Sequence, residues 1–490
     1  MISIRLDGAA ELAGTVACPV GTAEGESAAG TPLAAGTPLA VLPSDVAAEV
    51  DAFLAATEHK GSAGALQTLP RPLREPSKVL LAGVGSGDEA GWRAAGAALA
   101  RAAAKESVLT VLAPADLTDA ALRGLAEGLW LASYRFRVAE EKPEAAPKLA
   151  EVVVAVEATP EREAALAATR IVAGHTRFAR DLTNTPSLTK TPEWFVRQVR
   201  ERAGDGVTVT VREREQLEAE GFGGILAVGG GSVNEPRLLE LSWSPADATT
   251  HVVLVGKGIT YDTGGIDIKP NDAMQLMRKD MGGAAAVVGA LLAVADLGLP
   301  VRVTALAPLA ENMVSGSAWR PGDVVTHYGG LTSEVRSTDA EGRVVLGDAM
   351  AYAVENLGPD LLIDLATLTG ASRIALGKKT AALFSANEEL IGGLTAAGAA
   401  AGEPLWRLPL AEEYAGDVSS DIADLDNAAG NPGTITAALY LREFAGSLRD
   451  RWVHIDMSSP AWSASPDAEL TKGATGWGVR TLVRWLTTVA

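Results

Sequence analysis

The sequence predicts an α/β fold divided into two domains, and three observations lead to this prediction. Short β-branched and apolar runs alternate with alanine-rich helical stretches through the first third of the chain. A second alternation, richer in glycine, follows residue 181. Between them lies a helical stretch, Thr159 to Arg180, followed by the helix-breaking run Asn184-Thr185-Pro186-Ser187. Strands alternating with helices are typical of layered α/β domains.

Residues 1–158 are predicted to form the smaller, N-terminal α/β domain. Its expected strands are 78–84, 108–113 and 151–156, and its expected helices are 44–56, 92–104 and 117–132. Positions 21–43 are rich in Gly, Ala, Thr and Pro and predict a surface loop. The run Gly83-Val84-Gly85-Ser86-Gly87 resembles a dinucleotide-binding loop. No suitable acid follows about 20 residues later, so a strand-to-helix turn is favoured over a nucleotide site.

Residues 159–180 are predicted to be a linker helix, with Thr159 as N-cap and Pro160 in the first helical position. Residues 181–490 are predicted to form the larger C-terminal α/β domain. Its expected strands are 207–211, 238–242, 251–256, 301–308, 361–365 and 452–456. Its expected helices are 192–203, 283–297, 344–357, 388–401, 434–444 and 479–488.

The composition is that of a globular protein whose partners are not polyanions. The 490 residues are 47% hydrophobic and 21% charged, and 61 acidic against 42 basic residues give a net charge of −19. Such a chain is repelled by nucleic acids and anionic membranes. The longest apolar run, Ala284 to Ala295, is too short to span a bilayer, and no signal-peptide pattern opens the sequence. We therefore expect a cytoplasmic protein with no membrane partner.

Cysteine and histidine chemistry is also restricted. Cys18 is the only cysteine, so no intramolecular disulfide and no cysteine-built zinc site can form. The five histidines are scattered, with no two at metal-ligand spacing.

The segment from Gly256 to Gly283 carries the first chemical signal. The expected strand 251–256 ends directly before Lys257, and Asp262 and Asp280 follow among small and apolar residues. Ligands bind beyond the carboxyl ends of strands in open α/β sheets. A phosphate-binding loop is excluded, since the Walker spacing is missing. Two alternatives remain: solvated acids with glycines in tight turns, or buried acids that need a cationic or metal partner.

The segment Ser337-Thr338-Asp339-Ala340-Glu341-Gly342-Arg343 carries the second signal. It can be interpreted as a capping box, with Thr338 as N-cap and Glu341 three residues on. Gly342 argues against a purely structural cap, because glycine weakens a helix. If the backbone is instead extended, Asp339, Glu341 and Arg343 project to one side.

Charge counting suggests how these segments act together. Asp262, Asp280, Asp339 and Glu341 would repel one another if gathered alone, and two divalent cations would neutralise them. Paired metals about 3.5–4 Å apart act as Lewis acid, hydroxide source and substrate template. Lys257 could be a ligand only as a neutral amine, which nearby dications favour. Lys269 and Arg343 would stay cationic and could stabilise an oxyanion.

Several motifs resemble those of the leucyl aminopeptidase (cytosol aminopeptidase) family. Ser337 to Arg343 differs from the family signature Asn-Thr-Asp-Ala-Glu-Gly-Arg only at its first position. Further matches, in the family's order, are Gly256 to Thr260, Asp280 to Ala284, Ala366 to Ala371 and Lys472 to Gly476. The resemblance covers about residues 160 to 490 and fades in the first third.

The resemblance implies a metallopeptidase domain with a central mixed sheet and two divalent metals in each site. One metal would be held by Lys257, Asp262, Asp280 and Glu341, the other by Asp262, Asp339 and Glu341. A metal-bound water or hydroxide would be the nucleophile, and zinc or manganese, or else magnesium or cobalt, would fill the sites.

The resemblance also implies roles for residues around the metals. Lys269 would stabilise the oxyanion, and Arg343 would bind a bicarbonate that acts as general base. Met277, Thr367 and Gly370 would contact the substrate, a peptide with a leucine-like N-terminal residue. The family further implies a homohexamer, and it allows DNA binding, which the net charge disfavours.

Four positions depart from the family pattern. Ser337 replaces Asn, Tyr261 replaces Phe and Thr263 replaces Ser, and all three keep the expected ligands. Asp267 stands where the family often has a small neutral residue, two positions before Lys269. Its carboxylate could pair with Lys269 and tune it, or face away.

Overall fold

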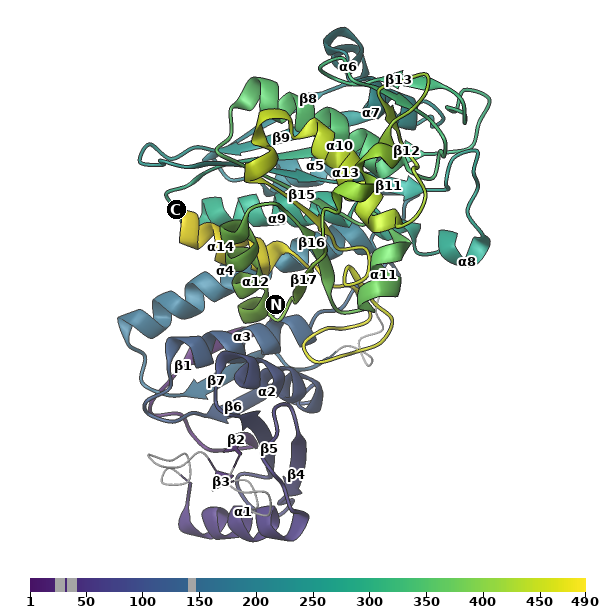
Figure 1. Ribbon diagram of the computed structural model, residues 1–490. Helices are drawn as coiled ribbons and strands as arrows, with labels where there is room; N and C mark the ends of the chain where they lie inside the picture. The colour runs from purple at the N-terminus through teal and green to yellow at the C-terminus, as the bar shows by residue number, and fades with distance from the viewer. Residues whose placement is uncertain (23–30, 33–41, 140–146) are drawn as a thin grey trace. The chain divides into compact units, whose positions relative to one another are not determined.

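The computed structural model describes residues 1–22, 31–32, 42–139 and 147–490 (Figure 1). The chain divides into two compact units. Unit 1 comprises Met1–Gly174 and Ser463–Lys472, and unit 2 comprises His175–Trp462 and Gly473–Ala490. Helix α4 (Pro160–Asn184) contributes residues to both, and it begins at Pro160 as predicted. Each unit has its own mixed sheet and helices, which confirms the α/β fold class.

Unit 1 is built on a seven-stranded sheet. The strand order is β1-β7-β6-β2-β5-β4, with β3 paired to β2. Neighbours from β1 to β5 run parallel, whereas β4 and β3 pair antiparallel. The strands are β1 (Ser3–Leu6), β2 (Thr15–Gly21), β3 (Thr31–Pro32), β4 (Leu66–Pro70), β5 (Lys78–Gly85), β6 (Val108–Leu112) and β7 (Glu151–Ala155).

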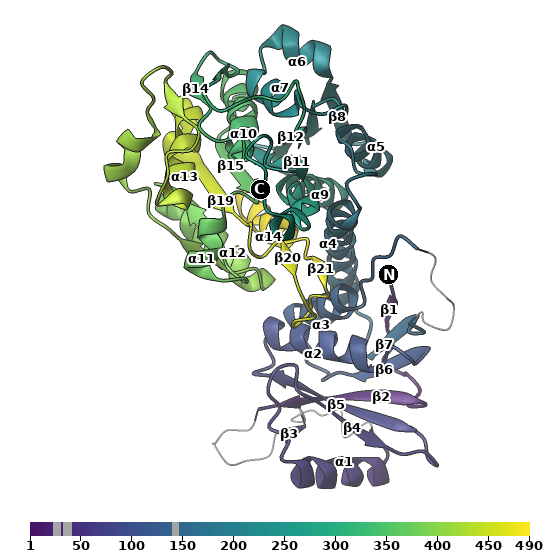
Figure 2. The same ribbon diagram turned by 90° about the vertical axis from the view of Figure 1, so that its right-hand side faces the viewer.

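Helices cover both faces of this sheet (Figure 2). Leu80 of β5 packs in one core with α2 (Glu89–Ala102) and α3 (Asp119–Ala132). The next residue, Leu81, packs in the opposite core with α1 (Ser44–Thr57), because successive strand side chains point to opposite faces. Cys18 lies in this second core, where burial raises the pKa of its thiol to about 12.

The predicted elements of unit 1 are present, with ends shifted by a few residues. Helix α2 begins earlier than predicted because Asp88 caps it, accepting a hydrogen bond from the Gly91 N–H at 2.7 Å. Gly83 to Gly85 end β5, and the predicted turn to α2 follows at Ser86 and Gly87, with positive φ at Gly85 and Gly87. The prediction of a loop over 21–43 is wrong at Thr31 and Pro32, which form strand β3. Residues 23–30 and 33–41 of this segment lie outside the described residues.

Unit 2 is built on a nine-stranded mixed sheet. The strand order is β17-β16-β19-β15-β10-β12-β9-β8, with β11 paired to β12. The strands are β8 (Val207–Arg212), β9 (Arg237–Trp243), β10 (His251–Gly256), β11 (Gly258–Asp262), β12 (Arg302–Asn312), β15 (Leu361–Ala366), β16 (Ala381–Phe384), β17 (Leu405–Arg407) and β19 (Trp452–Asp456). Short strands outside this sheet are β13 (Val324–Thr326), β14 (Thr332–Glu334), β18 (Leu425–Asp426), β20 (Trp462–Ser463) and β21 (Gly473–Ala474).

Helices again lie on both faces (Figure 1). Helices α7 (Gly223–Gly229), α10 (Glu341–Tyr352) and α13 (Gly433–Phe444) share a core with Val253 and Val255 of β10. Helix α9 (Gly282–Leu297) contacts β10, β12 and β15, and α14 (Val479–Val489) packs on α9. The other helices are α5 (Pro192–Arg202), α6 (Arg214–Glu220), α8 (Asn271–Met274), α11 (Gly370–Leu376) and α12 (Glu388–Ala401), with short helical turns at η2 (Met277–Lys279), η3 (Ala353–Leu357), η4 (Glu412–Val418) and η5 (Gly446–Arg451).

The four central strands of unit 2 place a group of polar residues at one edge. Strands β12, β10, β15 and β19 are parallel neighbours, so their carboxyl ends meet at the same side of the sheet. Lys257 follows β10, Thr367 follows β15, and Asn312 and Asp456 end β12 and β19. This edge is where ligands bind in open α/β sheets.

One stretch, Asn271–Leu297, is long and apolar enough to cross a membrane by length and composition. Most of its apolar part is α9, and 83% of the most apolar window is buried inside the fold. Burial of this extent is that of a core helix.

Candidate metal centre

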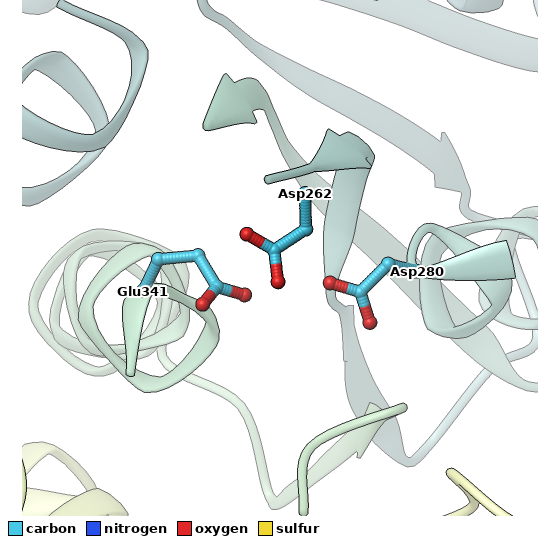
Figure 3. A group of neighbouring side chains, drawn as sticks. All are labelled: Asp262, Asp280 and Glu341. Atoms are coloured by element: carbon cyan, nitrogen blue, oxygen red, sulfur yellow. The ribbon is translucent and has the colours of Figure 1, made fainter. Parts of the chain in front are cut away.

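Three buried carboxylates converge at the carboxyl edge of the unit 2 sheet (Figure 3). Asp262 ends β11, Asp280 follows the η2 turn, and Glu341 is the first residue of α10. One carboxylate oxygen from each lies within 4.8 Å of the others. The fold thus brings together three carboxylates from separate segments, and these are three of the four acids that the sequence analysis singled out.

Lys257 lies between two of these carboxylates. Its Nζ is 2.8 Å from Asp280 Oδ2 and 2.7 Å from Glu341 Oε1. Neither contact has hydrogen-bond geometry, and both oxygens are buried without a hydrogen-bond partner among the described residues. Buried carboxylate oxygens normally have such partners. In the described part of the chain, the cation that both oxygens face is the Lys257 ammonium group.

Lys269 connects the buried cluster to Asp339. Its Nζ is 2.7 Å from Asp262 Oδ2 and pairs closely with Asp339 Oδ1. Asp339 keeps 39% of its side chain exposed and is not one of the three clustered carboxylates. The fourth predicted acidic ligand is thus adjacent to the cluster, with the Lys269 ammonium group between it and Asp262.

The electrostatics of the site show a shortage of positive charge. Four carboxylates face two ammonium groups. Burial, and then Asp262, raise the pKa of Glu341, and burial raises the pKa of Asp339. Burial opposes the charge of Lys257 and Lys269, yet the surrounding carboxylates outweigh it and raise the pKa of both amines. Glu341, Asp339 and both lysines thus bind protons more tightly here, and a site of this charge fits divalent cations.

Arg343 is a buried cation without an anionic partner. It forms no ion pair within the described part of the chain, and its Nε has no hydrogen-bond partner there. Its guanidinium carbon lies 6.0 Å from the centre of the Tyr440 ring. Burial lowers the pKa of Arg343. A guanidinium in this state can bind a small anion.

The backbone around Glu341 differs from both sequence interpretations. Helix α10 begins at Glu341, and its N-cap, Ala340, makes no side-chain cap, so the capping box with Thr338 as N-cap is wrong. The extended alternative is wrong as well, because Glu341 to Arg343 form the first helical turn. Glycine is required at position 342 for steric reasons, because a Cβ there would lie 2.4 Å from Lys257 Cε.

The three predicted substrate contacts lie in different environments. Thr367 is buried, and its Oγ1 donates to Asp280 Oδ1 at 2.7 Å, while Lys257 Nζ donates to the Thr367 carbonyl oxygen at 3.3 Å. Met277 begins the η2 turn and is half-buried. Gly370 begins α11 and is exposed. The structure thus joins Thr367 to the carboxylate cluster itself.

Asp267 pairs with Thr338 rather than with Lys269. Its Oδ2 accepts a hydrogen bond from the Thr338 N–H at 2.8 Å. The direct pairing with Lys269 that the sequence left open is therefore not the arrangement found.

Two polar residues at the same edge were missed by sequence reasoning. Asn312 Nδ2 donates to Asp262 Oδ1 at 2.8 Å. The buried Asp456 carboxylate accepts the N–H groups of Leu368 and Thr369 at 3.1 and 3.0 Å, and so holds the loop after β15. Both are last residues of central strands, and that position is the signal that could have identified them.

Comparisons with known proteins agree with this geometry. The family model described as "Cytosol aminopeptidase family, catalytic domain" matches residues 177–483, and that family's N-terminal domain model matches residues 20–143. A probable cytosol aminopeptidase of Syntrophotalea carbinolica is 46% identical over 380 residues, 76% of either chain. A probable cytosol aminopeptidase of Corynebacterium glutamicum is 39% identical over 447 residues, covering 90% of this chain and 87% of its own.

Solved structures extend the comparison. The bottromycin maturation enzyme BotP in complex with Mn is 38% identical, with a TM-score of 0.84 over 97% of this chain and 99% of that one. A mutant of tomato leucine aminopeptidase is 32% identical, with a TM-score of 0.86 over 100% and 97% of the two chains. The chain belongs to the cytosol aminopeptidase family and is a metal-dependent aminopeptidase, a hydrolase that acts on peptides.

Proposed function

We propose that this aminopeptidase uses two divalent metals to remove leucine-like N-terminal residues from peptides. One observation carries the proposal: a buried cluster of carboxylates in which Asp280 Oδ2 and Glu341 Oε1 have no hydrogen-bond partner among the described residues. Four carboxylates against two ammonium groups leave two negative charges unbalanced in the metal-free site.

Lys257, Asp262, Asp280 and Glu341 would hold one metal, and Asp262, Asp339 and Glu341 the other, so that Asp262 and Glu341 are shared. When bound, the metals supply Lewis acidity and activate water at neutral pH. Oxygen ligands with one amine accept zinc or manganese, and also magnesium or cobalt. Metal binding would displace Lys269 from Asp262 Oδ2 and would require the neutral form of Lys257.

Lys269 is suited to stabilise negative charge on the substrate carbonyl oxygen. In the metal-free site, burial opposes the charge of Lys269, but the surrounding carboxylates outweigh it and raise the pKa of the amine. The ammonium group would stay beside the proposed metal ligands after its release from Asp262. A preorganised cation in a largely buried site stabilises an oxyanion more strongly than water does. Lys269 would therefore act on the developing charge rather than as a base.

Arg343 would hold bicarbonate, which would supply a general base beside the metals. This assignment is supported by the buried guanidinium, which has no ion-pair partner among the described residues. Met277, Thr367 and Gly370 would contact its N-terminal residue, and the flexible, apolar Met277 side chain suits leucine-like groups.

The assembly proposed is a homohexamer, and the location proposed is the cytoplasm. Exposed apolar side chains of unit 2, among them Ile374, Trp406 and Ile422, are compatible with subunit contacts. The relatives' names, cytosol aminopeptidase, support the location.

Metal removal gives the central test. Chelation is expected to abolish hydrolysis of a leucyl chromogenic amide, and zinc or manganese to restore it, with two metals per chain by elemental analysis. Asp339→Ala should lower kcat/KM by at least about 100-fold, because one ligand of the second metal is lost. Asp116→Ala, at an exposed position of unit 1, is the control and should be unchanged. Activity that survives both chelation and Asp339→Ala would refute the proposal.

Gly342→Ala tests whether the position of Lys257 matters. The added methyl would lie 2.4 Å from Lys257 Cε, so the flexible end of Lys257 must move away from Asp280 and Glu341. We expect a small loss of stability but at least about tenfold weaker metal binding, measured by calorimetry on the metal-free protein. Gly392→Ala in α12, where no atom lies within 4 Å, should stabilise by up to about 1 kcal/mol and leave metal binding unchanged. Wild-type metal affinity in Gly342→Ala would count against Lys257 as a ligand.

Arg343→Ala tests the bicarbonate assignment. Loss of the anion site should lower kcat by about 100-fold, the usual size of a general-base contribution. Added bicarbonate should stimulate the bicarbonate-depleted wild type and leave the variant unaffected. An equal response of both proteins would show that the anion acts elsewhere.

Light scattering tests the assembly. The molar mass in solution is expected to be six times that of one chain at concentrations where the enzyme is active. A fully active monomer would remove the hexamer from the proposal.

A further inference from the structure

Thr338, the residue before Asp339, is completely buried, and all its polar groups bind two other segments. Its N–H donates to Asp267 Oδ2 at 2.8 Å, and its Oγ1 donates to the Gly264 carbonyl oxygen at 2.6 Å. The same Oγ1 accepts the Asp267 N–H at 2.9 Å, and the Thr338 carbonyl oxygen accepts from Asn312 Nδ2 at 2.9 Å.

Asn312 extends this network to a proposed metal ligand. Its amide group has two hydrogens, and the second binds Asp262 Oδ1 at 2.8 Å. The Gly264 N–H donates to the same oxygen at 2.9 Å, so Asp262 Oδ1 is held from two sides. Asp262 Oδ2 is left to face Lys269.

The backbone at Gly265 packs closely against Thr338 and Asn312. Gly265 has a φ of +66°, and a Cβ there would lie 2.8 Å from Thr338 Oγ1 and 3.0 Å from Asn312 Oδ1. Because Thr338 and Asn312 are buried, breaking a hydrogen bond of either leaves a polar group without a partner, which is costly. The loop after β11, the end of β12 and the turn before α10 are therefore fixed against one another.

The residues that this network joins are those that would share the metals. Asp262 receives a hydrogen bond from Asn312, and Asp339 directly follows Thr338. The carboxylates of Asp262 and Asp339 repel each other, so without these hydrogen bonds the two segments would move apart. We infer that Asn312, Thr338 and Asp267 are positioning residues that hold Asp262 and Asp339 at the separation the two metals require. This inference rests on the proposed two-metal function.

The test compares Thr338→Val with Thr338→Ser. Valine has nearly the same shape but lacks the hydroxyl, whereas serine keeps it. Metal-free protein is titrated with Mn²⁺ by calorimetry, and kcat, KM and the melting temperature of the metal-free form are measured in parallel. We expect Thr338→Val to bind Mn²⁺ at least about tenfold more weakly, with kcat lowered and KM little changed, and Thr338→Ser to restore both.

A second pair guards against a folding defect in the first. Asp267 is exposed, so its substitution is well tolerated. Asp267→Ala removes the acceptor for the Thr338 N–H, while Asp267→Asn keeps one oxygen. We expect weaker Mn²⁺ binding in the alanine variant only.

The outcomes separate the two ideas. If the wild type binds two Mn²⁺ and the valine and alanine variants bind them equally well, losing only melting temperature, the positioning role is wrong. If the wild type itself binds fewer than two Mn²⁺, the proposed two-metal function fails, and the inference fails with it.

Discussion

The architecture of unit 2 depends on holding like-charged carboxylates close together away from water. Asp262, Asp280 and Glu341 are nearly fully buried, and such groups repel strongly at low dielectric. Lys257 and Lys269 offset part of this repulsion. Helices α9 and α10 offset a further part of the repulsion, because each begins beside the cluster and directs the positive end of its dipole toward it. Four carboxylates against two ammonium groups still leave an excess of negative charge, which bound dications would offset. This group involves only four of the 61 acidic residues.

The glycines around Lys257 are required for space. A Cβ at Gly256 would lie 2.6 Å from Ala284 Cα, and one at Gly283 would lie 2.2 Å from the Leu365 carbonyl oxygen. Gly342 leaves the corresponding space for the Lys257 side chain. Strand β10 can therefore bring Lys257 directly against α9, β15 and α10. The glycine-rich sequence reflects this close approach, and no phosphate-binding role is needed to explain it.

Periodicity and strand-end position were enough to predict the α/β class and most central elements, from β10 and β12 to α9 and α14. They were not enough for β1, β2 and β4, which are short or lack a clear apolar pattern, nor for the start of α10. The predicted ligands came from residue type and from motif resemblance. Asn312 and Asp456 were missed because the hydrogen bonds that place them at the site join residues 50 to 88 positions apart, and no local pattern encodes such bonds. Predicting them requires knowing which strand ends are neighbours.

The carboxylate cluster and the loop after β15 form one rigid structure. Thr367 donates to Asp280 and accepts from Lys257, while Asp456 binds the next two N–H groups of the same loop. Asp280 cannot move without breaking its hydrogen bond to Thr367. The loop cannot move without leaving the buried Asp456 carboxylate short of its N–H donors, which is costly. The loop proposed to contact the substrate is thus positioned by the residues proposed to bind metal. Under the proposed function, metal ligation and substrate alignment would share one set of hydrogen bonds, and a substitution in this loop would affect both.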